Sequence, residues 1–236
     1  MARRTQAGGR PVAVRVDDIV RVGRQVGMAR LSLAAVAAEL GVSTPALYRH
    51  IDGRWELERL VGESLLADLE LQDDPADGPQ RHLFSFAMQL RDFVLARPGL
   101  ATYMQVLFPR GASGRALLTT EMNMLTARGY APQAAITLAS AVASLTIGLI
   151  VAEERPAAAA DPAGYERELV AVTSAIFEDP VLGPAHVGLP VVTPEEYTKA
   201  LMTAAISGLV AAAPPGREIG AVVDGLLAEH RTKKEQ

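Results

Sequence analysis

Apolar residues recur at helical spacing along almost the whole chain. No stretch shows the sustained alternation of Val, Ile and Thr, broken by hairpin turns, that indicates a sheet. The pattern therefore predicts an all-α fold. Its first helix is expected over Val16 to Val26, where Gly27 would end it. The buried stripe of this helix should consist of Ile19, Val20, Val22 and Val26.

Two short helices are expected next. Ser32 is a suitable N-cap for a helix over Leu33 to Leu40, which Gly41 would stop. Ser43 would cap the following helix, with Pro45 in its first turn, where a missing N–H costs nothing. A two-turn helix, a three-residue turn with Gly and a second short helix have helix-turn-helix spacing. The predicted seam between the two helices comprises Leu33, Val36, Leu40, Val42 and Leu47.

The remaining apolar periods predict a larger helical part. A long amphipathic helix should run from Trp55 to Leu71, and Ser113 and Thr193 are expected to cap later helices, Thr193 in a capping box with Glu196. The segment 177–194 carries four prolines and is expected to be a loop. The further helices are predicted at 80–96, 99–107, 114–128, 132–154, 162–178, 194–213 and 217–231. We divide the chain into a mobile basic arm (1–11), a helix-turn-helix domain (12–60) and a helical domain (61–236).

One predicted helix is long enough to cross a membrane. Residues 131–152 carry no charge, but they include Ser, Thr and Gln and lack the aromatic belt of membrane helices. We therefore interpret this segment as a helix buried in a core or a subunit interface, and expect no membrane partner. The segment 201–213 is similarly apolar, so two such helices could pair across a two-fold axis of a homodimer.

Charge and composition limit the classes of function that the chain could have. Residues 1–59 hold 10 Arg against 6 Asp or Glu, a net +4, whereas the remainder carries a net −8. This asymmetry suggests that the first part meets a polyanion. The chain has no cysteine, which excludes disulfides and thiolate sites and fits a cytoplasmic location. It also lacks a Gly-x-Ser-x-Gly elbow, a metal-spaced His pair and a phosphate loop, so we expect no enzyme, metal or cofactor.

The segment "LSLAAVAAELGVSTPALYRHIDGRWEL", Leu31 to Leu57, resembles the DNA-binding segment of the TetR (tetracycline-repressor) family. The resemblance rests on Ala37, Gly41-Val42, Ser43, Ala46-Leu47-Tyr48, His50 and the basic residue before the next helix. Ile51 stands where Phe is usual, and Arg54 where Lys is usual. The segment 125–154 is similar to the ligand-binding and dimerisation part of tetracycline repressors proper.

The resemblance implies a division of labour among the residues of the helix-turn-helix. Thr44, Pro45 and Ala46 would face base edges, while Tyr48, His50 and Arg54 would bind phosphates, for which their N–H and O–H groups are suited. Two further residues are open to a second interpretation. Arg49 is a backbone contact or a plain exposed arginine, and Ser32 is a phosphate donor, a helix cap or both.

A ligand cavity is expected in the helical domain. Flexible and aromatic side chains that could form its wall are Phe86, Met88, Tyr103, Met104 and Met122, and the polar groups that could orient a ligand include Gln89, Gln105 and Ser144. Core packing would explain each of the apolar residues equally well. In drug-binding repressors a histidine that helps to hold a magnesium-drug complex lies where this chain has Ser144, so we expect no metal there.

Together these features predict a ligand-responsive regulator. We expect a dimeric repressor that binds a pseudo-palindromic operator in double-stranded DNA and is released by a small, largely apolar effector. The alternative is a helical small-molecule-binding or interaction protein whose head is vestigial. The presence of Tyr48, His50 and Arg54 together argues against that alternative, because nothing in the fold requires all three.

Overall fold

The computed structural model describes residues 14–107, 111–154 and 161–231, with side chains up to residue 228. These residues form twelve α-helices and one 3-10 turn and contain no strand, which confirms the all-α prediction. The basic arm predicted at 1–11 lies outside the described residues.

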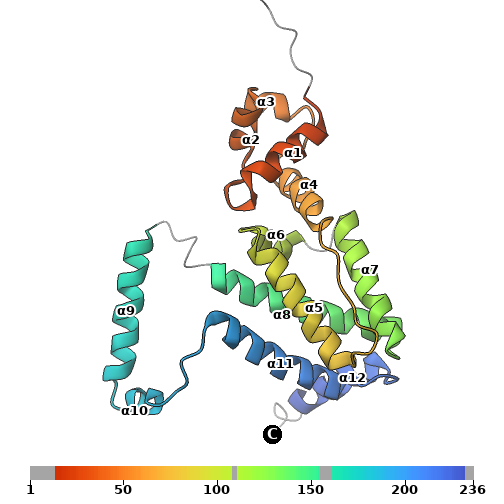
Figure 1. The fold of residues 1–236 in the computed structure, drawn as a ribbon, viewed down its shortest axis with the longest axis vertical. Coiled ribbons are helices and arrows are strands. Elements are labelled where there is room, and N and C mark those ends of the chain that lie inside the picture. Colours follow the sequence, from red (N-terminus) through yellow and green to blue (C-terminus); the bar gives the residue numbers. More distant parts are fainter. Residues whose placement is uncertain (1–13, 108–110, 155–160, 232–236) are drawn as a thin grey trace, which may run out of the picture.

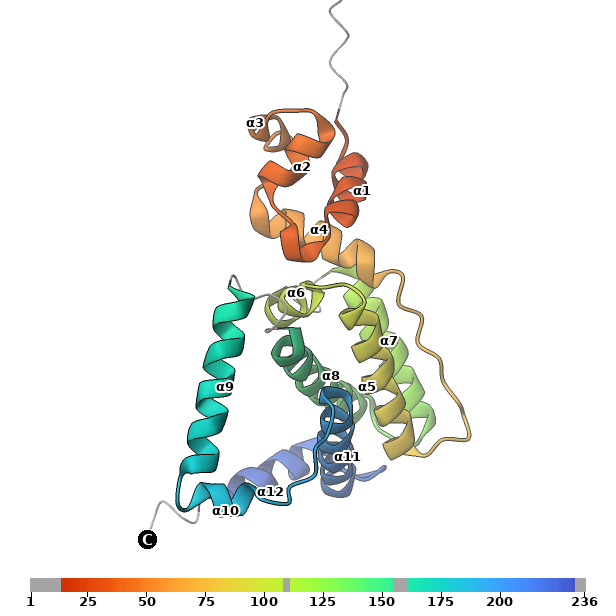
Figure 2. The ribbon, with the colours of Figure 1, turned by 60° about the vertical axis from the view of Figure 1, so that its left-hand side comes forward.

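The helices form a small head above a larger body (Figure 1). The head contains α1 (Val16–Val26), η1 (Met28–Arg30), α2 (Leu33–Leu40), α3 (Thr44–Leu47) and α4 (Arg54–Leu66). The body contains α5 (Pro79–Leu95), α6 (Leu100–Leu107), α7 (Ala112–Ala127), α8 (Pro132–Glu154), α11 (Pro194–Ala212) and α12 (Ile219–Arg231). Between α8 and α11 the chain forms an arm of α9 (Pro162–Glu178) and α10 (Leu182–His186), which stands apart from the body in Figures 1 and 2.

The head folds through the local signals in its sequence. Ser32 Oγ accepts a hydrogen bond from Ala35 N at 3.1 Å, and Gly41 ends α2 in the left-handed conformation at φ +67°. The bounds predicted for α1 and α2 are confirmed. Val36 and Leu47 are fully buried in the seam between α2 and α3, with Leu33, Leu40 and Val42 packed around them.

Four local predictions were wrong. The helix expected at 55–71 ends at Leu66, because the following segment crosses the body as an extended chain. The second helix of the helix-turn-helix is a single turn, Thr44–Leu47, and Ser43 makes no side-chain cap. Helix α7 begins at Ala112, so Ser113 lies inside it and is not its cap. The loop expected at 177–194 contains α10.

Polar side chains hold the extended segment 67–78 onto the body. The buried His82 ring lies between Asp73 Oδ1 and Glu121 Oε1, at 2.9 Å from each. Arg128 pairs with Asp73 at 2.6 Å and donates to the backbone oxygens of Asp74 and Asp77. The Arg128 guanidinium is the main cause that lowers the pKa of the Asp73 carboxyl below its usual value. These contacts replace the helical hydrogen bonds that the segment would otherwise make.

Helix α8 is the centre of the body. It packs against α5, α6, α7 and α11. Its length and apolar composition would suffice to cross a membrane, but half of its most apolar window is buried inside the protein. The buried residues are Ala134, Ala135, Leu138, Ala139, Val142, Ala143, Thr146, Ile147 and Ile150.

The close approach of α4 to α6 gives a stability test. A methyl group at Gly62 would lie 2.5 Å from Tyr103 Cε1, far inside van der Waals contact. We expect Gly62→Ala to lower the free energy of unfolding by about 1–3 kcal/mol, measured by urea unfolding followed by circular dichroism. The control is Gly225→Ala, inside α12, where an added methyl meets nothing within 4 Å. That variant should gain about 0.5–1 kcal/mol. Unchanged stability of Gly62→Ala would contradict the observed packing.

Candidate nucleic-acid interface and effector cavity

The α2–α3 turn presents a set of polar and small side chains to solvent. Leu47 is 0% exposed and anchors α3 to the head, whereas Pro45, Tyr48, Arg49 and His50 are exposed. The side chains of Thr44 and Ala46 are half-buried. Because α3 is one turn long and uses a single large apolar anchor, its other side chains are free to face a partner.

Arg54 lies close to this surface, at the start of α4. Its Nε donates to Glu58 Oε1 at 2.6 Å, and its guanidinium carbon lies 6.0 Å from the centroid of the Trp55 ring. The predicted phosphate contact is therefore engaged by a carboxylate in the free protein. Ser32 is exposed and caps α2, so its capping role is confirmed while its phosphate role stays a prediction.

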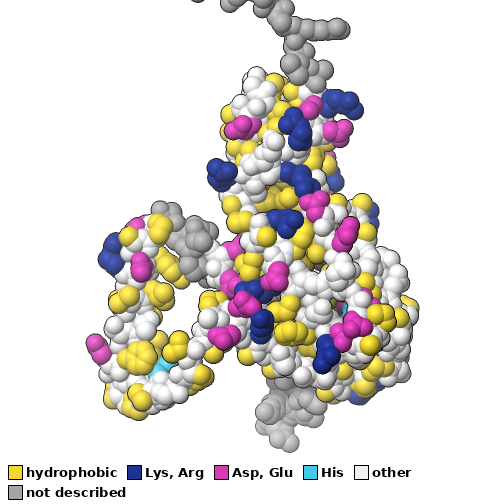
Figure 3. All heavy atoms as spheres, viewed as in Figure 1, with side chains coloured by type: hydrophobic (Ala, Val, Ile, Leu, Met, Phe, Trp, Pro, Cys, Tyr) yellow, Lys and Arg dark blue, Asp and Glu magenta, His cyan; other side chains and the backbone are white. Residues whose placement is uncertain are grey.

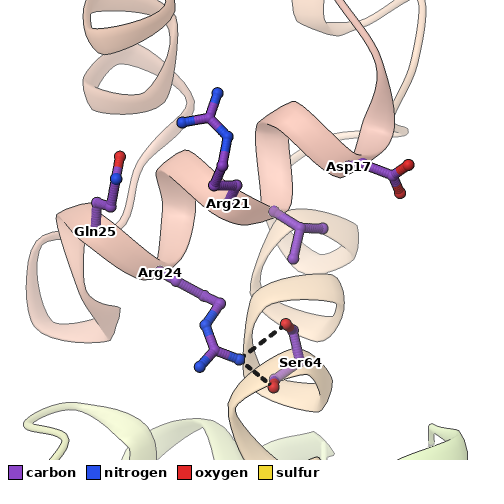
Figure 4. A pocket seen from close by; sticks show the side chains of 6 residues that line it. Asp17, Arg21, Arg24, Gln25 and Ser64 are labelled. Carbon is purple, nitrogen blue, oxygen red and sulfur yellow. Dashed lines mark hydrogen bonds between the residues drawn. The ribbon is translucent and has the colours of Figure 1, made fainter.

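A surface hollow of about 500 Å³ lies between α1 and α4 (Figure 4). Arg24 points from α1 to α4, where it donates to the Ser64 backbone oxygen, to Ser64 Oγ at 3.1 Å and to Asp68. Arg24 is thus a tie between two helices of the head. The hollow is lined by Asp17, Val20, Arg21, Arg24, Gln25 and Ser64.

A second cavity of about 500 Å³ lies in the body between α6, α7 and α8. Three of the predicted ligand residues line it: Met104 and Gln105 on α6 and Ser144 on α8. No charged side chain is among its lining residues, which are Met104, Gln105, Val106, Leu118, Ser140, Ala143, Ser144 and Ile147. The cavity can therefore accept an uncharged molecule, with one amide and two hydroxyls available for hydrogen bonds.

The structure places the other predicted ligand residues away from this lining. Phe86 is buried in the core, and Met88 and Met122 pack against it. Gln89 bonds to both backbone groups of Gln72, at 2.7 and 2.9 Å, and so fastens the 67–78 segment. Met104 lines the cavity, whereas Met88 packs against the core. The two are the same residue type, so their different positions result from packing alone.

Tyr103 takes part in a contact between head and body. Its hydroxyl donates to Glu63 Oε1 on α4 at 3.1 Å. The Glu63 carboxylate also accepts from the backbone N–H groups of Gly111, Ser113 and Gly114, at 3.2, 2.7 and 3.2 Å. Glu63 is 9% exposed. A carboxylate of the head thus satisfies the free N–H groups at the start of α7, where the helix dipole also favours a negative charge.

A second carboxylate holds the other end of α6. Glu154, at the end of α8, accepts from the backbone N–H of Gly99 at 3.2 Å, and burial raises the pKa of its carboxyl. The adjacent Pro98 oxygen accepts from Ala29 N of η1 at 3.0 Å. Helix α6 is therefore joined to the head at two points, through η1 just before its start and through α4 at Tyr103.

Sequence reasoning missed Glu63 and Glu154 as organising residues. An acidic residue on an amphipathic helix is normally solvated, and the partners of Glu63 lie 40 to 51 residues away. Gly62, beside Glu63, was a signal of this contact. A glycine inside a helix lowers its stability, so its presence there indicates that another group approaches closely.

Comparison with known proteins identifies the head. Residues 16–57 match the sequence model described as "Bacterial regulatory proteins, tetR family". The head is therefore that of a TetR-family regulator. No curated protein sequence matches the chain.

Solved structures share the fold of the whole chain at low identity. Streptomyces coelicolor ActR in complex with actinorhodin is 19% identical, with a TM-score of 0.72 over 87% of this chain and 100% of ActR. A TetR variant from Acinetobacter baumannii AYE in complex with minocycline is 17% identical, with a TM-score of 0.58 over 83% and 96% of the two chains. The regulator SCO7222 from S. coelicolor is 24% identical, with a TM-score of 0.58 over 84% and 98%.

The Tyr103 contact predicts a particular response to alkaline pH. Burial, and then the charge of Glu63, raise the pKa of the Tyr103 phenol. The folded protein thus holds this proton more tightly than the unfolded chain, so the associated stability is complete below the unfolded tyrosine pKa of about 10 and is lost above it. We expect the free energy of unfolding, measured with urea, to fall less steeply above about pH 10 for Tyr103→Phe than for the wild type.

The control for this measurement is Tyr197→Phe, which changes a tyrosine that is 55% exposed. Its alkaline loss should match that of the wild type. Equal slopes for the wild type and Tyr103→Phe would mean that the phenol is solvated in the folded protein.

Proposed function

We propose that this TetR-family protein is a transcriptional repressor that binds a pseudo-palindromic operator as a homodimer and leaves it when a small, largely apolar effector enters the α6–α7–α8 cavity. The observation that carries the proposal is the surface formed by the exposed Pro45, Tyr48, Arg49, His50 and Arg54 with the half-buried Thr44 and Ala46. Thr44 and the apolar surfaces of Pro45 and Ala46 suit base edges, and the hydroxyl, imidazole and guanidinium groups suit phosphates. Figure 3 shows Lys and Arg side chains on the head with Asp and Glu among them.

Two exposed apolar surfaces support a dimer. Leu145 on α8 is 45% exposed in the middle of an uncharged stretch, and Leu201 on α11 is 39% exposed. On α9 the exposed side chains include Leu169 and Phe177, at 52% and 55%. Surfaces of this kind are typical of subunit contacts, and a two-fold dimer would bring two heads to half-sites one helical turn apart.

The proposed release of DNA depends on helix α4. At one end α4 carries Arg54, and near the other it carries Glu63, which is bonded to Tyr103 of α6. The neighbouring Met104 lines the cavity. An effector that displaces α6 would therefore move α4 and change the spacing of the two heads. A coupling free energy of about 1–3 kcal/mol between cavity and head would be sufficient for release.

The effector class follows from the cavity. Its lining is uncharged, with Gln105, Ser140 and Ser144 as polar groups, which supports a neutral molecule carrying a few hydroxyl or carbonyl oxygens. ActR, of similar fold, has been solved with actinorhodin. We propose the same general kind of ligand here, an aromatic molecule without a bound metal. We also propose a cytoplasmic location.

The experiment that tests the proposal is a genome-wide pull-down of DNA fragments by the purified protein at near-physiological salt, because salt governs all charge-driven enrichment. A short palindrome recovered by the wild type would support the repressor, and the genes beside it would indicate the effector. No enrichment above a DNA-binding variant would overturn the proposal and favour a vestigial head.

The variant for this comparison is Tyr48→Phe with His50→Ala. It removes two donors assigned to phosphates, each hydrogen bond to a charged group being worth about 1.5–3 kcal/mol. We expect operator affinity, measured by fluorescence anisotropy, to fall by at least about 100-fold, with helicity and dimerisation unchanged. Tyr197→Phe, which removes a hydroxyl from an exposed tyrosine of the body, is the control and should bind normally. Wild-type affinity of the double variant would contradict the phosphate assignment.

The Arg54–Glu58 pair predicts a variant that binds DNA more tightly. Glu58 competes with phosphate for the Arg54 guanidinium. We expect Glu58→Gln to raise operator affinity by about 2- to 5-fold and to steepen its logarithmic salt dependence by up to about 1. Glu39→Gln removes the same charge from an exposed position of α2 for which no ion pair is present among the described residues. An equal gain from both variants would show that net charge, and not the release of Arg54, is responsible.

A further inference from the structure

The head exposes two aromatic side chains at one corner. Among its described residues, the large hydrophobic side chains that are substantially exposed are Val16 at 37%, Tyr48 at 56% and Trp55 at 60%. A largely exposed indole forgoes the hydrophobic stabilisation that its burial would provide. Tyr48 is assigned to a DNA phosphate in the proposed function, whereas that function does not explain the exposure of the Trp55 ring.

Trp55 lies beside the proposed phosphate contacts. It follows Arg54 at the start of α4, and the guanidinium carbon of Arg54 is 6.0 Å from its ring centroid. The start of α4 also lies against Tyr48, because a methyl group at Gly53 would be 3.8 Å from Tyr48 Cε1. Tyr48, Arg54 and Trp55 therefore form one surface, which we name the α3–α4 corner.

We propose that Trp55 is a further DNA contact, with the indole face packed against a deoxyribose and Nε1–H donating to a neighbouring phosphate oxygen. This inference rests on the proposed function. An indole has an apolar face and a single N–H donor, and a duplex backbone alternates apolar sugars with anionic phosphates, so the two surfaces are complementary. The contact is to backbone only. It strengthens binding to every sequence and fixes the orientation of the head without selecting bases.

The chain offers its own probe, since Trp55 is its single tryptophan. Tryptophan emission is followed while the full-length protein is titrated with the recovered operator duplex and, separately, with a random duplex of equal length. Anisotropy of a label on the DNA reports binding independently. We expect emission to change with both duplexes and to saturate at the concentration at which anisotropy saturates.

Two substitutions separate the parts of the contact. Trp55→Phe keeps a flat apolar ring and loses the N–H donor, and should weaken binding about 3- to 10-fold. Trp55→Ala loses both and should weaken it about 10- to 100-fold. Each loss should be equal for operator and random DNA, which leaves the specificity ratio unchanged. The control is Tyr197→Ala, at a 55% exposed aromatic residue of the body, and it should bind as the wild type does.

The outcomes distinguish this contact from the function on which it rests. Normal binding by anisotropy, with constant tryptophan emission and full affinity of Trp55→Ala, would overturn the contact alone. A fall in the specificity ratio of Trp55→Ala would show that the ring reads bases and would overturn the backbone assignment. No binding of the wild type to either duplex would overturn the proposed function and this contact with it. Circular dichroism checks that each variant is folded.

Discussion

A single carboxylate, Glu63, joins the head to the body, and much of the arrangement depends on it. It belongs to α4 but caps the start of α7 and accepts a hydrogen bond from Tyr103 of α6. Three helices thus meet at one buried carboxylate, and the surrounding hydrogen-bond donors compensate for the loss of its hydration. The same contact demands glycine nearby: a methyl at Gly111 would lie 1.9 Å from the Glu63 carboxyl carbon. A carboxylate is a directional link, since displacement of any of the three helices breaks strong hydrogen bonds.

Other charges of the body are paired in the same manner. Arg91 pairs with Glu153 at 2.7 Å, and Glu153 also accepts from Thr198 of α11 at 2.7 Å. With the His82 and Arg128 contacts, these pairs fasten α5, α7, α8 and α11 by side chains that are satisfied on both sides. Glu121 Oε2 is an exception among the described residues, because it is buried without a partner. The body is therefore held by specific polar contacts around an apolar core, and helices of this body border the α6–α7–α8 cavity.

The head is organised differently. Its helices are short, its caps are local, and α3 has one large buried side chain, Leu47. Because one buried side chain anchors α3, the fold does not require the other side chains of this surface, which are available for a partner. Arg54 and Trp55 illustrate the point, since the first is paired with Glu58 and the second is 60% exposed. In the proposed complex, both would exchange their present surroundings for those of a duplex.

The sequence by itself determined the helical class, the bounds of α1 and α2, the cap at Ser32, the capping box at Thr193 and the family of the head. These features depend on residues a few positions apart, so periodicity and cap chemistry are sufficient to reveal them. Tertiary structure alone decided where α4 ends, which methionine lines the cavity and what Glu63 does. The 67–78 segment is extended because His82 and Arg128 hold it, and Met104 differs from Met88 only by its neighbours. Such outcomes depend on partners outside the local helix, such as Tyr103, 40 residues from Glu63, and Arg128, 55 residues from Asp73, which no local pattern encodes.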